Sequence, residues 1–148
     1  MSSTRFFCTC ITNNSDLKEC VSDIEYIDGT IIDVIKKARD LVHMGWSLAS
    51  NPLYGNLKPN QQPYRTIVLT KEKTDKNLKL NVESLTYLEQ AIRIYENAPV
   101  LVKPGQLKPE SEADFRYLDF NLLEETLRKC SILTSVLTRT TDGRTIIK

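Results

Sequence analysis

Residues 24–44, IEYIDGTIIDVIKKARDLVHM, place a short β-forming run, a turn and an amphipathic helix in immediate succession. Ile24–Ile27 predict a strand that ends at Asp28-Gly29. Thr30 and Asp33 approximate a capping box, with Asp in the place of the usual Glu or Gln. The helix that follows repeats apolar residues at spacings of 3 and 4, as an inward-facing stripe should. This stripe consists of Ile31, Ile35, Ala38 and Val42.

The alternation of strands and helices continues on both sides of this unit. Residues 5–12 predict a strand that is covered on both sides, because apolar residues occur on both of its alternating faces. Residues 64–70 predict a further strand, with the apolar run Ile67-Val68-Leu69 at its centre. A short helix is expected around residues 17–21, a longer one from Asn81 or Ser84 to Pro99, and a last one from Ser111. The expected core contacts near the C-terminus are Leu118, Leu122, Leu127, Cys130 and Leu137.

The order of these elements predicts one α/β domain over residues 1–148. We expect three layers, with a mostly parallel sheet of about three to five strands flanked by helices. Residues 100–102 are expected to form a short edge strand, and residues 140–148 either a disordered tail or a final β segment.

A parallel sheet would bring several polar residues to one rim, because ligands bind outside the carboxyl ends of its strands. Asn13 and Asn14 follow the first strand, Asp28 follows the second, and residues 70–73 end the third. The TNNSD turn at 12–16 also offers two roles at a helix start, ordinary capping or binding of an anion.

Residues 43–64, HMGWSLASNPLYGNLKPNQQPY, predict a long shaped loop at about 45–63, since three prolines and two glycines exclude a continuous helix or strand. Its aromatic and leucine residues favour an ordered loop. No carboxylate occurs between Asp40 and Glu72, which favours an anionic ligand. The candidate ligand-binding residues are Asn13, Asn14, His43, Asn51, Lys58, Asn60, Tyr64 and Arg65.

His43 is the only histidine, so any mechanism that needs imidazole must use it. Its position in the last turn before Gly45 also suits a protonated side chain that interacts with the helix dipole. Both roles stay open at this point.

Cys8 and Cys10 lie on the same face of one predicted strand, where they either pack as small apolar residues or share a soft metal. A tetrahedral site needs two further ligands, and only Cys20, Cys130 and His43 remain. We therefore expect no metal. No nucleotide-binding glycine motif is present, so we expect no cofactor.

Composition narrows the class of partner. The 148 residues carry a formal net charge of +1, which lacks the basic excess of nucleic-acid-binding proteins. No apolar run reaches the roughly 18 to 20 residues of a membrane span. We expect a cytoplasmic protein.

The sequence resembles the GrdX family, small proteins associated with the glycine, sarcosine and betaine reductase systems of anaerobic bacteria. The resemblance is carried by Thr12-Asn13-Asn14, by Asp40-Leu41-Val42-His43-x-Gly45, by Asn51-Pro52-Leu53-x-Gly55 and by Lys58-Pro59-Asn60-x-x-Pro63-Tyr64. The family has His-Pro-Leu in place of Asn51-Pro52-Leu53 and an acidic residue near Gln61 or Gln62. These departures weaken any acid/base role carried over from the family.

The resemblance implies a cytoplasmic accessory or regulatory protein of anaerobic amino-acid metabolism. We expect it to bind a small anionic metabolite or a component of a reductase complex through residues 43–65. The alternative is a small enzyme that acts on an anionic metabolite with His43 as acid or base.

Overall fold

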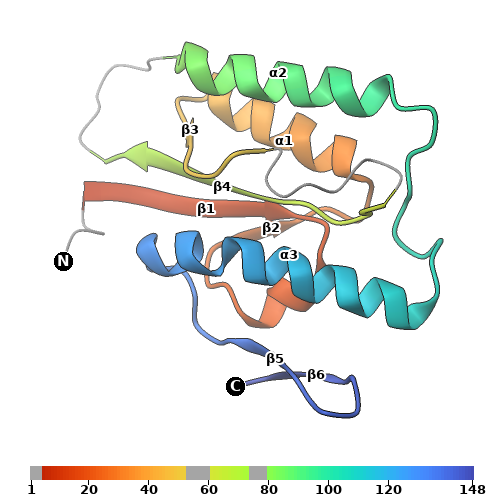
Figure 1. Cartoon of the computed structure of the whole chain (residues 1–148). Coiled ribbons are helices and arrows are strands. Elements are labelled where there is room, and N and C mark those ends of the chain that lie inside the picture. Colours follow the sequence, from red (N-terminus) through yellow and green to blue (C-terminus); the bar gives the residue numbers. More distant parts are fainter. Residues whose placement is uncertain (1–4, 53–60, 74–79) are drawn as a thin grey trace.

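A computed structural model describes residues 5–52, 61–73 and 80–148 (Figure 1). The elements along the chain are β1 (Phe6–Thr12), the 3-10 helix η2 (Ser15–Glu19), β2 (Ile24–Tyr26), α1 (Ile31–His43), β3 (Ser47–Leu48), β4 (Thr66–Glu72), α2 (Val82–Glu96), α3 (Pro109–Lys129), β5 (Leu137–Arg139) and β6 (Thr145–Ile147). The predicted α/β class is confirmed.

The main sheet is mixed, with the strand order β2-β1-β4-β3. Only β1 and β2 are parallel, while β4 runs antiparallel to both β1 and β3. The prediction of a mostly parallel sheet was therefore wrong. The prediction rested on the alternation of apolar strands with amphipathic helices. Strands that are buried on both faces have apolar runs whichever way they point, so this pattern carries no information about strand direction.

The antiparallel direction of β4 divides the expected rim. Thr12 pairs with Thr66 at one end of the sheet, and Phe6 pairs with Glu72 at the other. Asn13 and Asn14 therefore lie at the end where β4 begins, and residues 70–73 lie at the opposite end. Asp28 stays with the asparagines, because β2 is parallel to β1.

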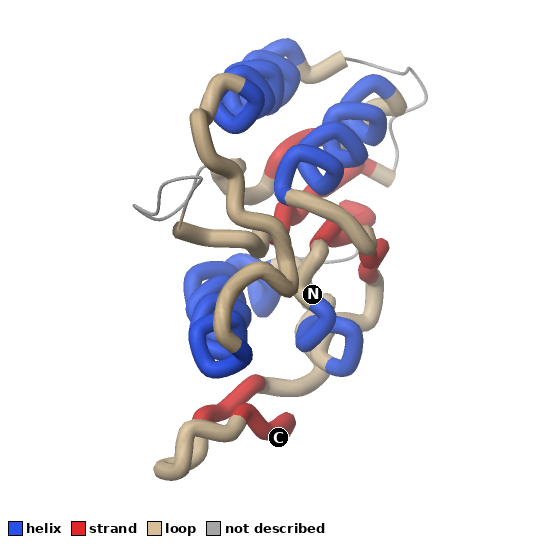
Figure 2. Tube along the Cα trace, turned by 90° about the vertical axis from the view of Figure 1, so that its right-hand side faces the viewer, coloured by secondary structure: helices blue, strands red, loops and turns tan. Residues whose placement is uncertain are grey.

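Helices cover both faces of the main sheet, as the three-layer prediction required (Figures 1 and 2). On one face, Ile11, Ile67 and Leu69 pack with the apolar stripes of α1 and α2. On the other face, Cys10 and Val68 pack with α3 and with Leu17 of η2. Successive strand residues thus point to opposite cores, as the alternation of a pleated strand dictates.

Local signals placed most helix boundaries well. Thr30 and Asp33 form the predicted capping box of α1. Gly45 follows the end of α1 with a φ of 99°, a left-handed conformation that glycine adopts without a side-chain clash. Asn81 caps α2 by accepting a hydrogen bond from the backbone N–H of Ser84.

The predicted inward face of α3 was partly wrong. Leu118 and Leu122 are 36% and 43% exposed, whereas Leu127 is buried as predicted. The buried side of α3 consists of Glu112, Asp119, Phe120, Leu123 and Leu127. Two carboxylates, Glu112 and Asp119, occupy this inward stripe. The prediction used apolar residues alone, and it therefore placed the buried face at the wrong residues.

The remaining corrections concern short segments. The predicted loop contains β3, which pairs with β4, and its residues 53–60 lie outside the described part of the chain. Residues 100–102 form no strand. Of the two possibilities for the tail, the structure has the β segment, because β6 pairs with β5. Among the described residues, no helix combines the length and apolar character needed to cross a membrane.

Candidate functional site

Asn13 holds the C-terminal end of the 43–65 segment. Its Nδ2 donates to the carbonyl oxygens of Pro63 (2.9 Å) and Gly29 (3.1 Å). Its Oδ1 accepts from the backbone N–H of Arg65 at 2.9 Å. Both amide N–H groups and the amide oxygen therefore bind the protein's own backbone. Asn13 joins β1, the turn before α1 and the start of β4.

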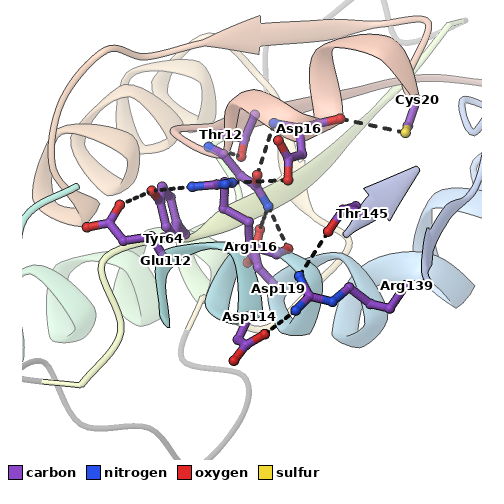
Figure 3. Close-up of polar contacts among 11 residues, drawn as sticks. Thr12, Asp16, Cys20, Tyr64, Glu112, Asp114, Arg116, Asp119, Arg139 and Thr145 are labelled. Atoms are coloured by element: carbon purple, nitrogen blue, oxygen red, sulfur yellow. Dashed lines mark hydrogen bonds and ion pairs between the residues drawn. The ribbon is translucent and has the colours of Figure 1, made fainter. Parts of the chain in front are cut away.

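Tyr64 is fixed by side chains of α3. Its hydroxyl donates to Oε1 of Glu112 at 2.5 Å and accepts from Nη1 of Arg116 at 3.1 Å. Arg116 also donates from Nε to Asp16 in η2 at 3.0 Å. These contacts join the end of the segment to the opposite layer of the fold (Figure 3).

The pKa values of Tyr64 and Glu112 move in opposite directions. Burial and the hydrogen bond with Glu112 raise the pKa of Tyr64 to about 12. Burial would also raise the pKa of Glu112, but hydrogen bonds from Tyr64 and from the backbone N–H groups of Leu107 and Gly105 outweigh it and hold that pKa below its usual value. Glu112 is thus a stable acceptor, and Tyr64 keeps its proton.

A second chain of hydrogen bonds runs through the buried layer beside it, and Figure 3 labels two of its members, Thr12 and Asp119. Thr66 donates its hydroxyl proton to Oδ2 of Asp119 at 2.6 Å. Thr12 and Thr66 lie 2.8 Å apart through their hydroxyl oxygens, so Thr12 is the donor in that contact. Asn14 donates from Nδ2 to the same Asp119 oxygen at 3.0 Å. Asp119 is fully buried and receives both donors at one oxygen.

Arg65 completes the buried end of the segment. It is 2% exposed, and its Nη2 donates to the hydroxyl of Tyr95 in α2 at 2.7 Å. We call this whole hydrogen-bonded set the anchor. Its members are Thr12, Asn13, Asn14, Asp16, Tyr64, Arg65, Thr66, Tyr95, Glu112, Arg116 and Asp119.

Four of the predicted ligand-binding residues, Asn13, Asn14, Tyr64 and Arg65, thus come together inside the anchor. The hydrogen bonds described above join them to the protein itself and fix the segment in place. Sequence reasoning missed their partners Glu112, Arg116 and Asp119. The signal for these three was their spacing of 4 and 3 along α3, which continues to the buried Leu123.

The other predicted residues lie elsewhere. His43 is exposed at the C-terminal end of α1. Asn13 lies near the other end of this helix, because it donates a hydrogen bond to the carbonyl oxygen of Gly29, just before α1 begins. A helix rises about 1.5 Å per residue, so roughly 20 Å separates His43 from the asparagine turn. Lys58 and Asn60 lie outside the described residues.

Two hollows lie along the described N-terminal part of the segment. The first hollow has a volume of about 310 Å³ and is lined by Phe6, Gly45, Ser47, Thr70, Lys71, Glu72, Leu80 and Asn81. The second hollow has a volume of about 260 Å³ and is lined by Leu48, Ala49, Ser50, Asn51, Pro52, Glu83, Ser84 and Tyr87. Asn51 is the predicted ligand residue that lines a hollow.

The fold changes the electrostatic picture drawn from the sequence. The segment itself has no carboxylate, but α2 brings Glu83 to the second hollow. Lys71 and Glu72 bring one charge of each sign to the first hollow. A small anion would therefore meet one charge of each sign in the first hollow and a carboxylate in the second.

All four cysteines belong to the core between the sheet and α3. Burial raises the pKa of Cys10 and raises that of Cys20 to about 11. Burial, together with a hydrogen bond with Cys8, raises the pKa of Cys130 to about 12. The described residues contain no group of three or more side chains suited to hold a metal ion. These three thiols stay protonated near neutral pH and pack as apolar groups.

Comparison with known proteins identifies a family that the chain matches. The model of a family described as GrdX-like protein matches residues 9–128, from β1 to nearly the end of α3. The β5–β6 hairpin lies beyond the matched range. No curated protein and no solved structure matches the chain.

Proposed function

The chain belongs to the GrdX-like protein family, and we propose that it is a cytoplasmic accessory or regulatory protein that binds a small anionic ligand or a partner protein through residues 43–65. Membership of the family implies an association with glycine reductase systems. The proposal assigns to this segment the contact through which the protein acts in such a system.

One observation supports this proposal above the others. The segment is fixed at residues 63–65 by the buried anchor, whereas its residues 45–52 line two hollows. A binding segment gains affinity when its backbone is held before the ligand arrives, because less conformational entropy is lost on binding. The anchor holds one end of the segment, and the pairing of β3 with β4 holds the backbone of the open end.

The positions of the described residues favour binding over catalysis. The alternative enzyme needs His43 beside groups that hold an anionic substrate. His43 lies at one end of α1, and Asn13 and Asn14 lie beyond its other end. Arg65 is buried against Tyr95. An acid or base, a nucleophile and stabilising donors are not brought to one place by these residues.

Calorimetric titration tests the proposal. The full chain is titrated with small carboxylates, acyl phosphates and purified reductase components, alongside Lys58→Ala and Asn51→Ala. We expect one class of these molecules to bind wild type and to bind one or both variants about tenfold more weakly. The matched control is Gln90→Ala, on the exposed side of α2 and outside both hollows. Equal affinity of all four proteins would place the binding surface outside this segment.

A further inference from the structure

The first hollow contains two opposite charges that no described ion pair neutralises. Lys71 and Glu72 are consecutive residues of β4, and both line the hollow. The salt bridges among the described residues involve other side chains. A molecule bound in the hollow would therefore meet one ammonium group and one carboxylate.

These two charges leave β4 on opposite faces. Consecutive side chains of a strand point to opposite sides of the sheet. Glu72 pairs with Phe6 and shares its face, whereas Lys71 pairs with Phe7 on the other face. A ligand that reaches both charges must therefore carry its own two charges apart from each other.

The other lining groups match such a ligand. Phe6 is 42% exposed and lies on the same face as Glu72, so its ring can cover a bound ammonium group through a cation–π contact. Leu80 offers an apolar surface. Ser47 adds a hydroxyl, and Asn81 keeps its amide N–H donors because only its Oδ1 caps α2. The volume of about 310 Å³ lies at the small end of ligand sites.

We propose that the first hollow binds a zwitterionic amino acid whose ammonium and carboxylate groups are separated by a short alkyl chain. Glu72 and Phe6 hold the ammonium group, Lys71 holds the carboxylate, and Leu80 contacts the chain. The inference rests on the proposed function, because Gly45 and Ser47 of the 43–65 segment line the same hollow. The ligand inferred for this hollow is thus a molecule that carries both charges, in place of the simple anion of the proposed function.

A set of four-carbon compounds tests this assignment by titration calorimetry on the full chain. 4-Aminobutanoate carries both charges at a distance, 2-aminobutanoate carries them on adjacent atoms, and butanoate and butylamine each carry one. We expect 4-aminobutanoate to bind and each of the other three to bind at least about tenfold more weakly, since each lacks one charged contact or its spacing.

Three variants then assign the contacts. Lys71→Gln and Glu72→Gln should each weaken 4-aminobutanoate about tenfold. Lys73→Gln is the matched control, because Lys73 is an exposed neighbour that does not line the hollow. Its affinity should equal that of wild type. Circular dichroism of each variant checks that the surface substitutions leave the fold intact.

The outcomes separate this inference from the proposal on which it rests. Equal binding of butanoate with no effect of Glu72→Gln would show a plain anion site, which overturns the zwitterion and leaves the proposed function standing. Tighter binding of 2-aminobutanoate would overturn the separated charges. If none of the four compounds binds, the inference is wrong, and the Lys58→Ala and Asn51→Ala titrations decide the proposed function independently.

Discussion

The two ends of the 43–65 segment differ in what their polar side chains do. Where the segment runs into β4, the side chains of residues 64–66 are buried and hydrogen-bonded to β1, α2 and α3. At residues 45–52 the chain follows a short edge strand and lines two hollows. The polar residues of this segment therefore divide between those that hold the segment in place and those that line the hollows, and burial separates the two groups.

The largest expected effect comes from removing the buried acceptor of the anchor. Asp119→Ala leaves the hydroxyl of Thr66 and the amide of Asn14 without their shared acceptor inside the core. We expect a loss of about 3 kcal/mol in the free energy of unfolding, measured by urea denaturation. Asp114→Ala on the exposed side of the same helix breaks its salt bridge to Arg139 and should cost less than about 1 kcal/mol. Similar losses of stability for Asp119→Ala and Asp114→Ala would contradict the structural role given to the buried carboxylate.

The same chemical change, made once in the anchor and once beside the second hollow, gives a closer test. Tyr64→Phe removes a buried hydroxyl that binds Glu112 and Arg116, and we expect it to lower the free energy of unfolding by roughly 1 to 2 kcal/mol. Tyr87→Phe removes a hydroxyl from a side chain that is 47% exposed and lines the second hollow. Its effect should stay within about 0.5 kcal/mol. Thermal and urea unfolding measure both, and a larger effect at Tyr87 would reverse the comparison.

The anchor should also respond to acid. The pKa of Glu112 is lower in the folded protein than its ordinary value of 4.5. The ionised Glu112 carboxylate therefore contributes fully to stability above about pH 5, and this contribution is lost as the pH falls through the folded-state pKa. The stability difference between wild type and Glu112→Gln should shrink between about pH 5 and pH 3. Urea unfolding across that range measures it.

Glu83→Gln, in α2 beside the second hollow, is the matched control for this series. It should change the free energy of unfolding little at neutral pH, because Glu83 is exposed. A difference between wild type and Glu112→Gln that stays constant from pH 7 to pH 3 would argue against a charged Glu112 as the acceptor for Tyr64.

The smallest expected effect on stability is at Asn51. It is exposed at the second hollow, so Asn51→Ala should change the free energy of unfolding by less than about 0.5 kcal/mol. The same variant should weaken ligand or partner binding if the open end performs the proposed function. A large loss of stability would instead make Asn51 a structural residue like Asn13.

Short-range signals predicted the elements well, and long-range geometry was harder. The capping box of α1 and the cap at Asn81 follow from local hydrogen bonds, so the sequence contains them in full. The direction of β4 depends on how the chain returns after α1, which apolar patterning does not encode. The roles of Asn13 and Tyr64 depend on partners about 50 residues away, so the sequence identified the residues without their partners.

The wide sequence separation within the anchor also constrains the order in which the protein folds. Thr12 meets Thr66 across 54 positions, and Asn14 meets Asp119 across 105. Contacts between distant parts of a chain form slowly, because a large loop must close before they stabilise anything. During synthesis the 43–65 segment leaves the ribosome well before α3 does. The segment therefore reaches its final restraint only after most of the protein has been translated.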